Sequence, residues 1–219
     1  MPKYMIHTCE KREWYVNNYL LPSMLEQGID RDDIIIWLDK GWGNLISCMK
    51  SFKSLPENDY TWHLQDDIII SSEFKKTTEK YNDFDGLVCG ICTEYDLDVR
   101  GHNNLEIPTF DELWWSFPCM KIPNKIAHEC VEYFESGQDL SCEEWKKKNK
   151  GDDSVFRRYI QVYYPTMKHI NLEPNIVDHI DYLLGGSLIN GARPKGIRAK
   201  YFREQNLVTE LERKLNGRV

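Results

Sequence analysis

Two pairs of adjacent aspartates are the residues of this chain whose type and spacing are best suited to chemistry. The first pair closes Gln65-Asp66-Asp67 and follows residues 60–64, which read as a strand. Two carboxylates at the end of a buried strand are costly unless a positive charge lies beside them. Mg²⁺ and Mn²⁺ favour carboxylate oxygens, keep several waters and complete their coordination with substrate phosphates. The triplet therefore predicts a divalent-metal site, with a turn built on aspartate side chains as the alternative.

The second pair lies in Gly151-Asp152-Asp153, directly before a helical stripe made by Val155, Tyr159 and Val162. The free amides and the dipole at a helix N-terminus stabilise a carboxylate as an anion. A carboxylate held in this way can accept a proton from a reacting hydroxyl group. A helix cap without chemistry is the alternative interpretation.

The elements that must position these acids alternate between apolar runs and helical stretches, as in a mostly parallel sheet covered by helices. Strands are predicted at residues 3–8, 33–39, 60–64, 84–92 and 114–122. Helices are predicted at residues 14–27 with an interruption at Pro22, and at 44–55, 73–82, 123–136, 154–164 and 204–215. The continuous apolar run within 33–39 is typical of a buried parallel strand. Ser71 or Ser72 is expected to cap the helix at 73–82, and residues 93–109 are expected to form a long loop of the kind that covers a site.

Composition and charge limit the class of protein. A chain of 219 residues with 41% hydrophobic residues suits one domain, and we divide it into halves at 1–92 and 93–190 with a basic tail at 191–219. A formal net charge of −7 argues against a general nucleic-acid binder. No apolar run approaches the roughly 20 residues that span a bilayer, and no signal peptide is evident. Seven irregularly spaced cysteines suit free thiols in a reducing compartment, so we expect a cytoplasmic protein.

Three segments together resemble the GT-A glycosyltransferases. Residues 63–74, around the first acidic pair, resemble the strand that carries the D-x-D signature, with Gln65 in place of the first acid. Residues 151–156 resemble the acidic motif that opens the acceptor-side helix of that family. Residues 173–180, which contain His179, and Gly185-Gly186-Ser187 after them resemble its C-terminal histidine segment. The resemblance covers roughly residues 3–190.

The resemblance implies an α/β fold of the GT-A (Rossmann-like) type, a mostly parallel sheet flanked by helices with a C-terminal acceptor-side helical region. It implies Asp67 and His179 as ligands of Mn²⁺ or Mg²⁺, and imidazole is a competent Mn²⁺ ligand beside carboxylate oxygens. Asp66 and Gln65 would contact the ribose or sugar of the donor. Asp153 would be the general base and Asp152 the helix cap, although the two can exchange roles.

By the same analogy, Thr8, Arg12 and Asp39 would face the nucleotide of the donor. All three follow predicted strands, and ligands of open α/β sheets bind beyond the carboxyl ends of the strands. The donor would be a nucleotide-diphosphate sugar, with a UDP-sugar expected first.

The acceptor stays open, between a saccharide, another hydroxyl compound and a hydroxymethylated DNA base as in phage modification; a phage-encoded enzyme would act in the host cytoplasm. A Rossmann dehydrogenase and a P-loop enzyme are disfavoured because neither glycine motif is present. A metal-dependent phosphoesterase or nuclease that uses the acids and His179 is an alternative function. A non-catalytic carbohydrate-binding protein is another. The basic residues 193–203 would contact phosphates or form a solvated tail.

Overall fold

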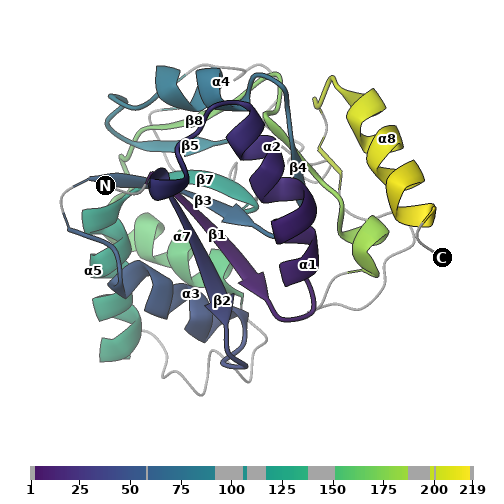
Figure 1. Cartoon of the computed structure of the whole chain (residues 1–219). Helices are drawn as coiled ribbons and strands as arrows, with labels where there is room; N and C mark the ends of the chain where they lie inside the picture. Colours follow the sequence, from purple (N-terminus) through teal and green to yellow (C-terminus); the bar gives the residue numbers. More distant parts are fainter. Residues whose placement is uncertain are drawn as a thin grey trace.

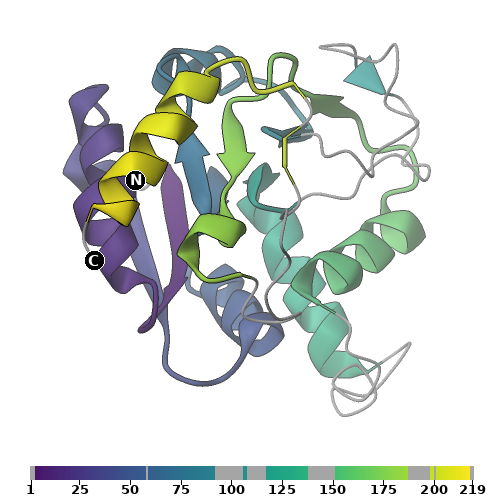
Figure 2. The same cartoon turned by 90° about the vertical axis from the view of Figure 1, so that its right-hand side faces the viewer.

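The fold is described from a computed structural model, at residues 3–57, 59–91, 106–107, 117–137, 151–186, 198–199 and 201–217. A central sheet lies between two groups of helices (Figure 1). The C-terminal helix α8, yellow in Figure 2, lies beside the purple helices of the N-terminal third, and the teal and green helices lie on the other side. No helix within these residues is long and apolar enough to cross a membrane.

Within the described residues, the sheet has seven strands in the order β2-β1-β3-β7-β5-β8-β6. The strands that run in one direction are β1 (Tyr4–Cys9), β2 (Ile34–Asp39), β3 (Tyr60–Gln65), β5 (Leu87–Cys89) and β8 (His169–Asn171). The strands that run in the opposite direction are β7 (Cys119–Pro123) and β6 (Glu106–Ile107). The predicted fold class, a mostly parallel α/β sheet flanked by helices, is confirmed.

A second sheet joins two short antiparallel strands, β4 (Ile68–Ile70) and β9 (Val177–His179). The helices are α1 (Glu13–Tyr15), η1 (Val16–Leu20), α2 (Leu21–Glu26), η2 (Arg31–Asp33), α3 (Asn44–Lys53), α4 (Phe74–Lys80), α5 (Asn124–Ser136), α7 (Asp152–Tyr163), η4 (Asp181–Leu184) and α8 (Gln205–Asn216). Of these, η1 is a π-helix, and η2 and η4 are 3₁₀-helices.

Helices cover both faces of the sheet, and successive side chains of its central strands point alternately to the two faces, so both faces are buried. Trp62 and Leu64 of β3 belong to the core cluster that also contains residues of α2, α4 and α8. His63 points to the other face, where its ring centroid lies 4.9 Å from that of Phe52 and 6.5 Å from that of Phe117. The sheet thus also carries buried polar side chains away from the strand ends, since His63 Nδ1 lies 2.9 Å from His7 Nε2.

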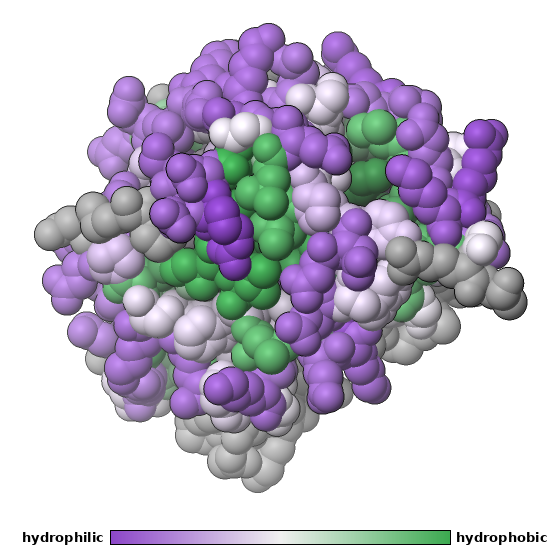
Figure 3. Space-filling model, in the orientation of Figure 1, coloured by the Kyte–Doolittle hydropathy of each residue, from purple (hydrophilic) through white to green (hydrophobic). Residues whose placement is uncertain are grey.

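Several local predictions were wrong for identifiable reasons. Pro22 does not break the helical stretch, but the π-helix η1 directly precedes it, so the hydrogen-bonding pattern changes from π to α at the start of α2. β2 is an edge strand, so only Ile34 is buried in it. Figure 3, which has the orientation of Figure 1, shows apolar residues near the centre of the surface, between α2 and α3. This agrees with the partial exposure of β2. Neither Ser71 nor Ser72 caps α4, whose N-cap is Glu73 without a side-chain hydrogen bond.

The predicted strand at 84–92 is shortened to β5, and that at 114–122 to β7, with 114–116 outside the described residues. The loop predicted at 93–109 lies outside the described residues apart from 106–107, where the prediction was wrong because these residues form β6. The helices at 44–55, 123–136, 154–164 and 204–215 were predicted to within two residues at each end.

Candidate active site

The first acidic pair lies in the turn between β3 and β4. Strands β1, β2 and β3 are parallel, so their carboxyl ends meet at one edge of the sheet, which is the usual ligand-binding edge of open α/β sheets. Asp66 is buried, and the backbone N–H of Cys9, at the end of β1, donates to its Oδ2 at 3.3 Å. Thr8, the residue before Cys9, is also buried, and its hydroxyl donates to the Cys9 carbonyl oxygen at 3.4 Å. The ends of β1 and β3 are thus joined by the Asp66 carboxylate.

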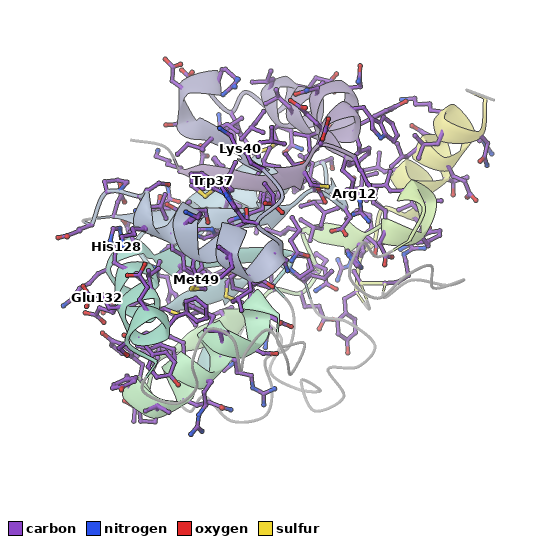
Figure 4. The ribbon with its side chains drawn as sticks, turned by 90° about the horizontal axis from the view of Figure 1, so that it is seen from below. Arg12, Trp37, Lys40, Met49, His128 and Glu132 are labelled. Carbon is purple, nitrogen blue, oxygen red and sulfur yellow. The ribbon has the colours of Figure 1, made fainter. Side chains whose placement is uncertain are left out.

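Arg12 is the cation of this site. Its Nη1 lies 2.5 Å from Asp67 Oδ2 and 3.3 Å from Asp66 Oδ1, and its Nη2 donates to the Gly186 carbonyl oxygen at 2.7 Å. Arg12 is only 3% exposed, and in Figure 4 it lies near the light-green ribbon that contains η4. The analogy placed Arg12 against the nucleotide, whereas the structure places its guanidinium against the two carboxylates.

His179 reaches the same acids from the far end of the chain. The antiparallel pairing of β4 and β9 sets His179 opposite Ile68, and the N–H of Ile180 donates to the Asp67 carbonyl oxygen at 2.8 Å. As a result His179 Nε2 lies 3.2 Å from Asp67 Oδ1. The other ring nitrogen, Nδ1, lies 3.8 Å from Oδ1 of the buried Asp181. The structure therefore brings together the two residues that the resemblance assigned to a metal.

The two acids of this pair differ in their proton affinity. Burial, together with the charge of Asp67, raises the pKa of Asp66 to about 6, against the opposing effects of Arg12 and Thr8. Burial also raises the pKa of Asp67, but His179 and Arg12 outweigh it and lower that pKa to about 2. Asp67 is therefore an anion held between two nitrogen groups across the physiological pH range.

The donor set around Asp67 fits Mn²⁺ or Mg²⁺. A carboxylate oxygen and an imidazole nitrogen lie side by side, and Mn²⁺ accepts both kinds of ligand. Within the described residues, no group of three or more His, Cys, Asp or Glu could hold a metal. The protein would thus supply few ligands, and waters and phosphate oxygens would supply the others, as is common for these ions.

Asp39 and Gln65 lie at the same edge, and both hydrogen-bond to backbone groups. The Asp39 carboxylate accepts hydrogen bonds from the backbone N–H groups of Trp42 at 2.9 Å and Gly43 at 3.2 Å. It thereby holds the turn after β2, where Gly43 has a φ of +83° that disfavours other residues. Gln65 ends β3, is half-buried, and donates its backbone N–H to the Pro118 carbonyl oxygen at 2.9 Å.

The second acidic pair occupies the first turn of α7. Its N-cap is Gly151, without a side-chain hydrogen bond, so the prediction of Asp152 as the cap was wrong. Asp152 is 5% exposed, and Asn44 Nδ2 donates to its Oδ1 at 2.7 Å. Asp153 is half-buried and accepts a hydrogen bond from the N–H of Ser154 at 2.7 Å. The buried member of this pair is therefore Asp152.

Burial of Asp152, reinforced by the neighbouring charge of Asp153, raises its pKa to about 7. Asn44 opposes this rise because it donates to the carboxylate. Asn44 is also the first residue of α3, which follows the carboxyl end of β2 after a short turn. The N-termini of α3 and α7 thus meet at the edge of the sheet that carries Asp66 and Asp67.

Sequence reasoning missed Asn44, the Gly186 carbonyl and the Cys9 N–H. Asn44 does begin a predicted helix, which is a weak signal, but its partner lies far away in the sequence. The Gly186 and Cys9 contacts come from the backbone, which leaves no signature in side-chain type. In the basic segment 193–203, Arg198 Nε donates to the buried Asp178 at 2.8 Å, and residues 193–197 and 200 lie outside the described residues.

No protein-family model matches the chain, and no curated protein matches it. Among solved structures, the apo form of the glycosyltransferase GlyE from Streptococcus pneumoniae TIGR4 matches with a TM-score of 0.38 and 11% sequence identity. The match covers 79% of this chain and 45% of GlyE, so this chain spans less than half of the length of GlyE. A likeness at this TM-score carries no argument about function, which has to come from the residues of the site.

Proposed function

We propose that this protein is a metal-dependent glycosyltransferase that moves a sugar from a nucleotide-diphosphate sugar, with a UDP-sugar expected first, to a hydroxyl acceptor. The observation that carries the proposal is the convergence of Asp67 and His179, whose Oδ1 and Nε2 atoms lie 3.2 Å apart at the carboxyl edge of the sheet. A carboxylate and an imidazole beside a buried arginine form a site suited to a diphosphate and a divalent cation.

Asp67 and His179 would hold the Mn²⁺ or Mg²⁺ ion. When bound, such an ion would neutralise the negative charge that develops on the departing diphosphate. Asp66, Thr8 and Gln65 lie at the same strand ends and would contact the ribose or sugar of the donor. This assignment extends the resemblance of the acidic segment to the D-x-D strand.

The acceptor would be activated from the second acidic pair. In the transfer step the acceptor oxygen bonds to the anomeric carbon, the bond from that carbon to the diphosphate oxygen breaks, and the hydroxyl proton passes to a carboxylate. Between the two acids, we assign this role to Asp152, because its pKa of about 7 lies near neutral pH, where a general base works best. Asp153, expected first from the sequence, would influence Asp152 through its charge.

The phosphoesterase alternative would require the two acidic pairs to share metal ions. The two pairs have different partners, since Asp67 contacts Arg12 and His179, whereas Asp152 contacts Asn44. These separate partners favour one metal site and one proton-accepting site, which is the division of labour that glycosyl transfer needs.

The test is a thermal-shift panel of nucleotide sugars, each with and without Mn²⁺. One donor is expected to raise the stability in Mn²⁺ by about 2.7 kcal/mol at a hundredfold excess over its dissociation constant. Asp67→Asn should lose this effect, whereas Asp32→Asn, a change at an exposed aspartate far along the chain, should keep it. If no nucleotide sugar changes the stability under either condition, the proposal is wrong.

A further inference from the structure

Arg12 is unusual for a residue of a proposed phosphate-binding site, because its guanidinium already forms ion pairs with carboxylates inside the protein. The guanidinium contacts both carboxylates of the first acidic pair and the Gly186 carbonyl oxygen, and the side chain is 3% exposed. Its Nε is buried and has no hydrogen-bond partner within the described residues. A buried arginine is costly unless acidic or carbonyl oxygens surround it, and these contacts supply such oxygens to Nη1 and Nη2.

In this arrangement Arg12 and a metal ion would compete for the Asp67 carboxylate. The Asp67 carboxylate gives Oδ2 to Arg12 at 2.5 Å and turns Oδ1 toward His179 at 3.2 Å. A divalent cation on Oδ1 would lie on the same carboxylate as the guanidinium, and like charges at such close range repel strongly in a buried site. In the absence of a donor, Arg12 therefore already provides the positive charge that the acids need.

A nucleotide diphosphate would change this balance. Guanidinium groups bind phosphate oxygens through paired hydrogen bonds at least as readily as they bind carboxylates. A diphosphate also brings the negative charge that allows a guanidinium and a divalent cation to lie near one another. Transfer of Arg12 from Asp67 to the diphosphate would free the carboxylate for the metal and would release the Gly186 carbonyl.

We propose that Arg12 is the internal counter-ion of the Asp66–Asp67 pair and yields Asp67 to the metal when the donor diphosphate binds. This inference rests on the proposed function and adds to it a coupling between metal and donor. The free protein binds the metal weakly, and the nucleotide strengthens that binding. The metal and the nucleotide strengthen each other's binding by the same factor, as linkage requires.

The test is the affinity for Mn²⁺, measured by electron paramagnetic resonance of free Mn²⁺, with and without UDP. Wild-type protein is compared with Arg12→Gln, Arg12→Lys and the control Arg31→Gln, whose arginine is exposed and donates to the Ile34 carbonyl oxygen. Without UDP, Arg12→Gln is expected to bind Mn²⁺ about tenfold more tightly than wild type, within the usual range of couplings. UDP should strengthen Mn²⁺ binding in wild type and in the control, and much less in Arg12→Gln. Arg12→Lys should resemble wild type without UDP.

Equal or weaker Mn²⁺ binding by Arg12→Gln in the absence of UDP would overturn this inference and leave the metal site intact. Absence of Mn²⁺ binding in every protein, with and without UDP, would overturn the metal site as well. If Arg12→Gln fails to fold, the Arg12 Nε–Hε resonance of the wild-type protein serves instead. That resonance should shift when UDP and diamagnetic Mg²⁺ are added together, and an unchanged resonance in a protein that binds both would also overturn the inference.

Discussion

The two pairs of adjacent aspartates are alike in sequence, but Asp67 of the first pair and Asp152 of the second lie in opposite environments. Asp67 lies against the nitrogen groups of Arg12 and His179, which lower its pKa to about 2 despite burial. Asp152 lies against the neutral amide of Asn44, and burial raises its pKa to about 7. Acids whose environments separate their pKa values in this way are suited to different tasks. We therefore propose that the first pair holds cations and that the second exchanges a proton.

Removal of the charge on Asp67 is expected to have the largest effect. Asp67→Asn keeps the shape of the turn between β3 and β4 but removes the anion that faces His179. Mn²⁺-dependent binding of nucleotide sugar, measured by calorimetry, should weaken by about a hundredfold or more, because hydrogen bonds and contacts to a charged group are the strong ones. Retained tight binding would mean that Asp67 does not hold the metal.

The corresponding change in the second pair, Asp152→Asn, tests the other half of the comparison between Asp67 and Asp152. Asp152→Asn should lower turnover by roughly a hundredfold to ten-thousandfold, the usual contribution of a general base, while the donor affinity barely changes. Asp153→Asn is the matched control, and its effect should be smaller because Asp153 is half-buried and bonded to its own helix. The reverse order of the two effects would return the base role to Asp153.

The raised pKa of Asp152 also predicts how stability depends on pH. Between the ordinary aspartate value near 4 and about 7, the folded protein binds more protons at Asp152 than the unfolded chain does. The contribution of Asp152 to stability is therefore complete at low pH and is lost as the pH rises through about 7. Urea unfolding across this window should show wild type losing stability relative to Asp152→Asn. A constant difference between the two proteins would contradict the buried, proton-binding state of Asp152.

Asn44 should have the smallest effect, because it acts only through Asp152. Asn44→Ala removes the hydrogen bond to Oδ1 and should cost about 1–3 kcal/mol of stability, as for other buried acceptors left without a donor. It should also raise the apparent pKa of the base in the pH–rate profile, because Asn44 lowers the pKa of Asp152. The control is Asn18→Ala in η1, where the wild-type amide donates to the Trp14 carbonyl oxygen in α1. This variant should leave the pH–rate profile unchanged.

Much of the fold was predictable because local pattern determines it. β1, β3 and α5 appear within two residues of their predicted ends, since apolar periodicity and Pro123 mark them in the sequence. β2 was predicted to be buried because its apolar run is continuous, but its place at the sheet edge depends on strand order, which no local pattern contains.

The candidate site divides in the same way. The acids and His179 are identifiable by residue type and order, and the structure places Asp67 and His179 together. The partners of Arg12 and Asp152 depend on tertiary packing. Arg12 turns inward to the Gly186 carbonyl oxygen and the two carboxylates of the first pair, and Asp152 is buried where α3 and α7 meet at Asn44.

The most direct test of the central claim is a pulsed electron paramagnetic resonance spectrum of Mn²⁺ bound in the presence of the nucleotide sugar identified by thermal shift. Coupling of the ion to an imidazole nitrogen is expected in wild type and should vanish in His179→Gln. The matched control is His128→Gln on α5, where the wild-type imidazole contacts the Leu55 carbonyl oxygen. This variant should keep the coupling. A nitrogen coupling that survives in His179→Gln, or bound Mn²⁺ without nitrogen coupling in wild type, would contradict the assignment of Asp67 and His179 to one metal ion.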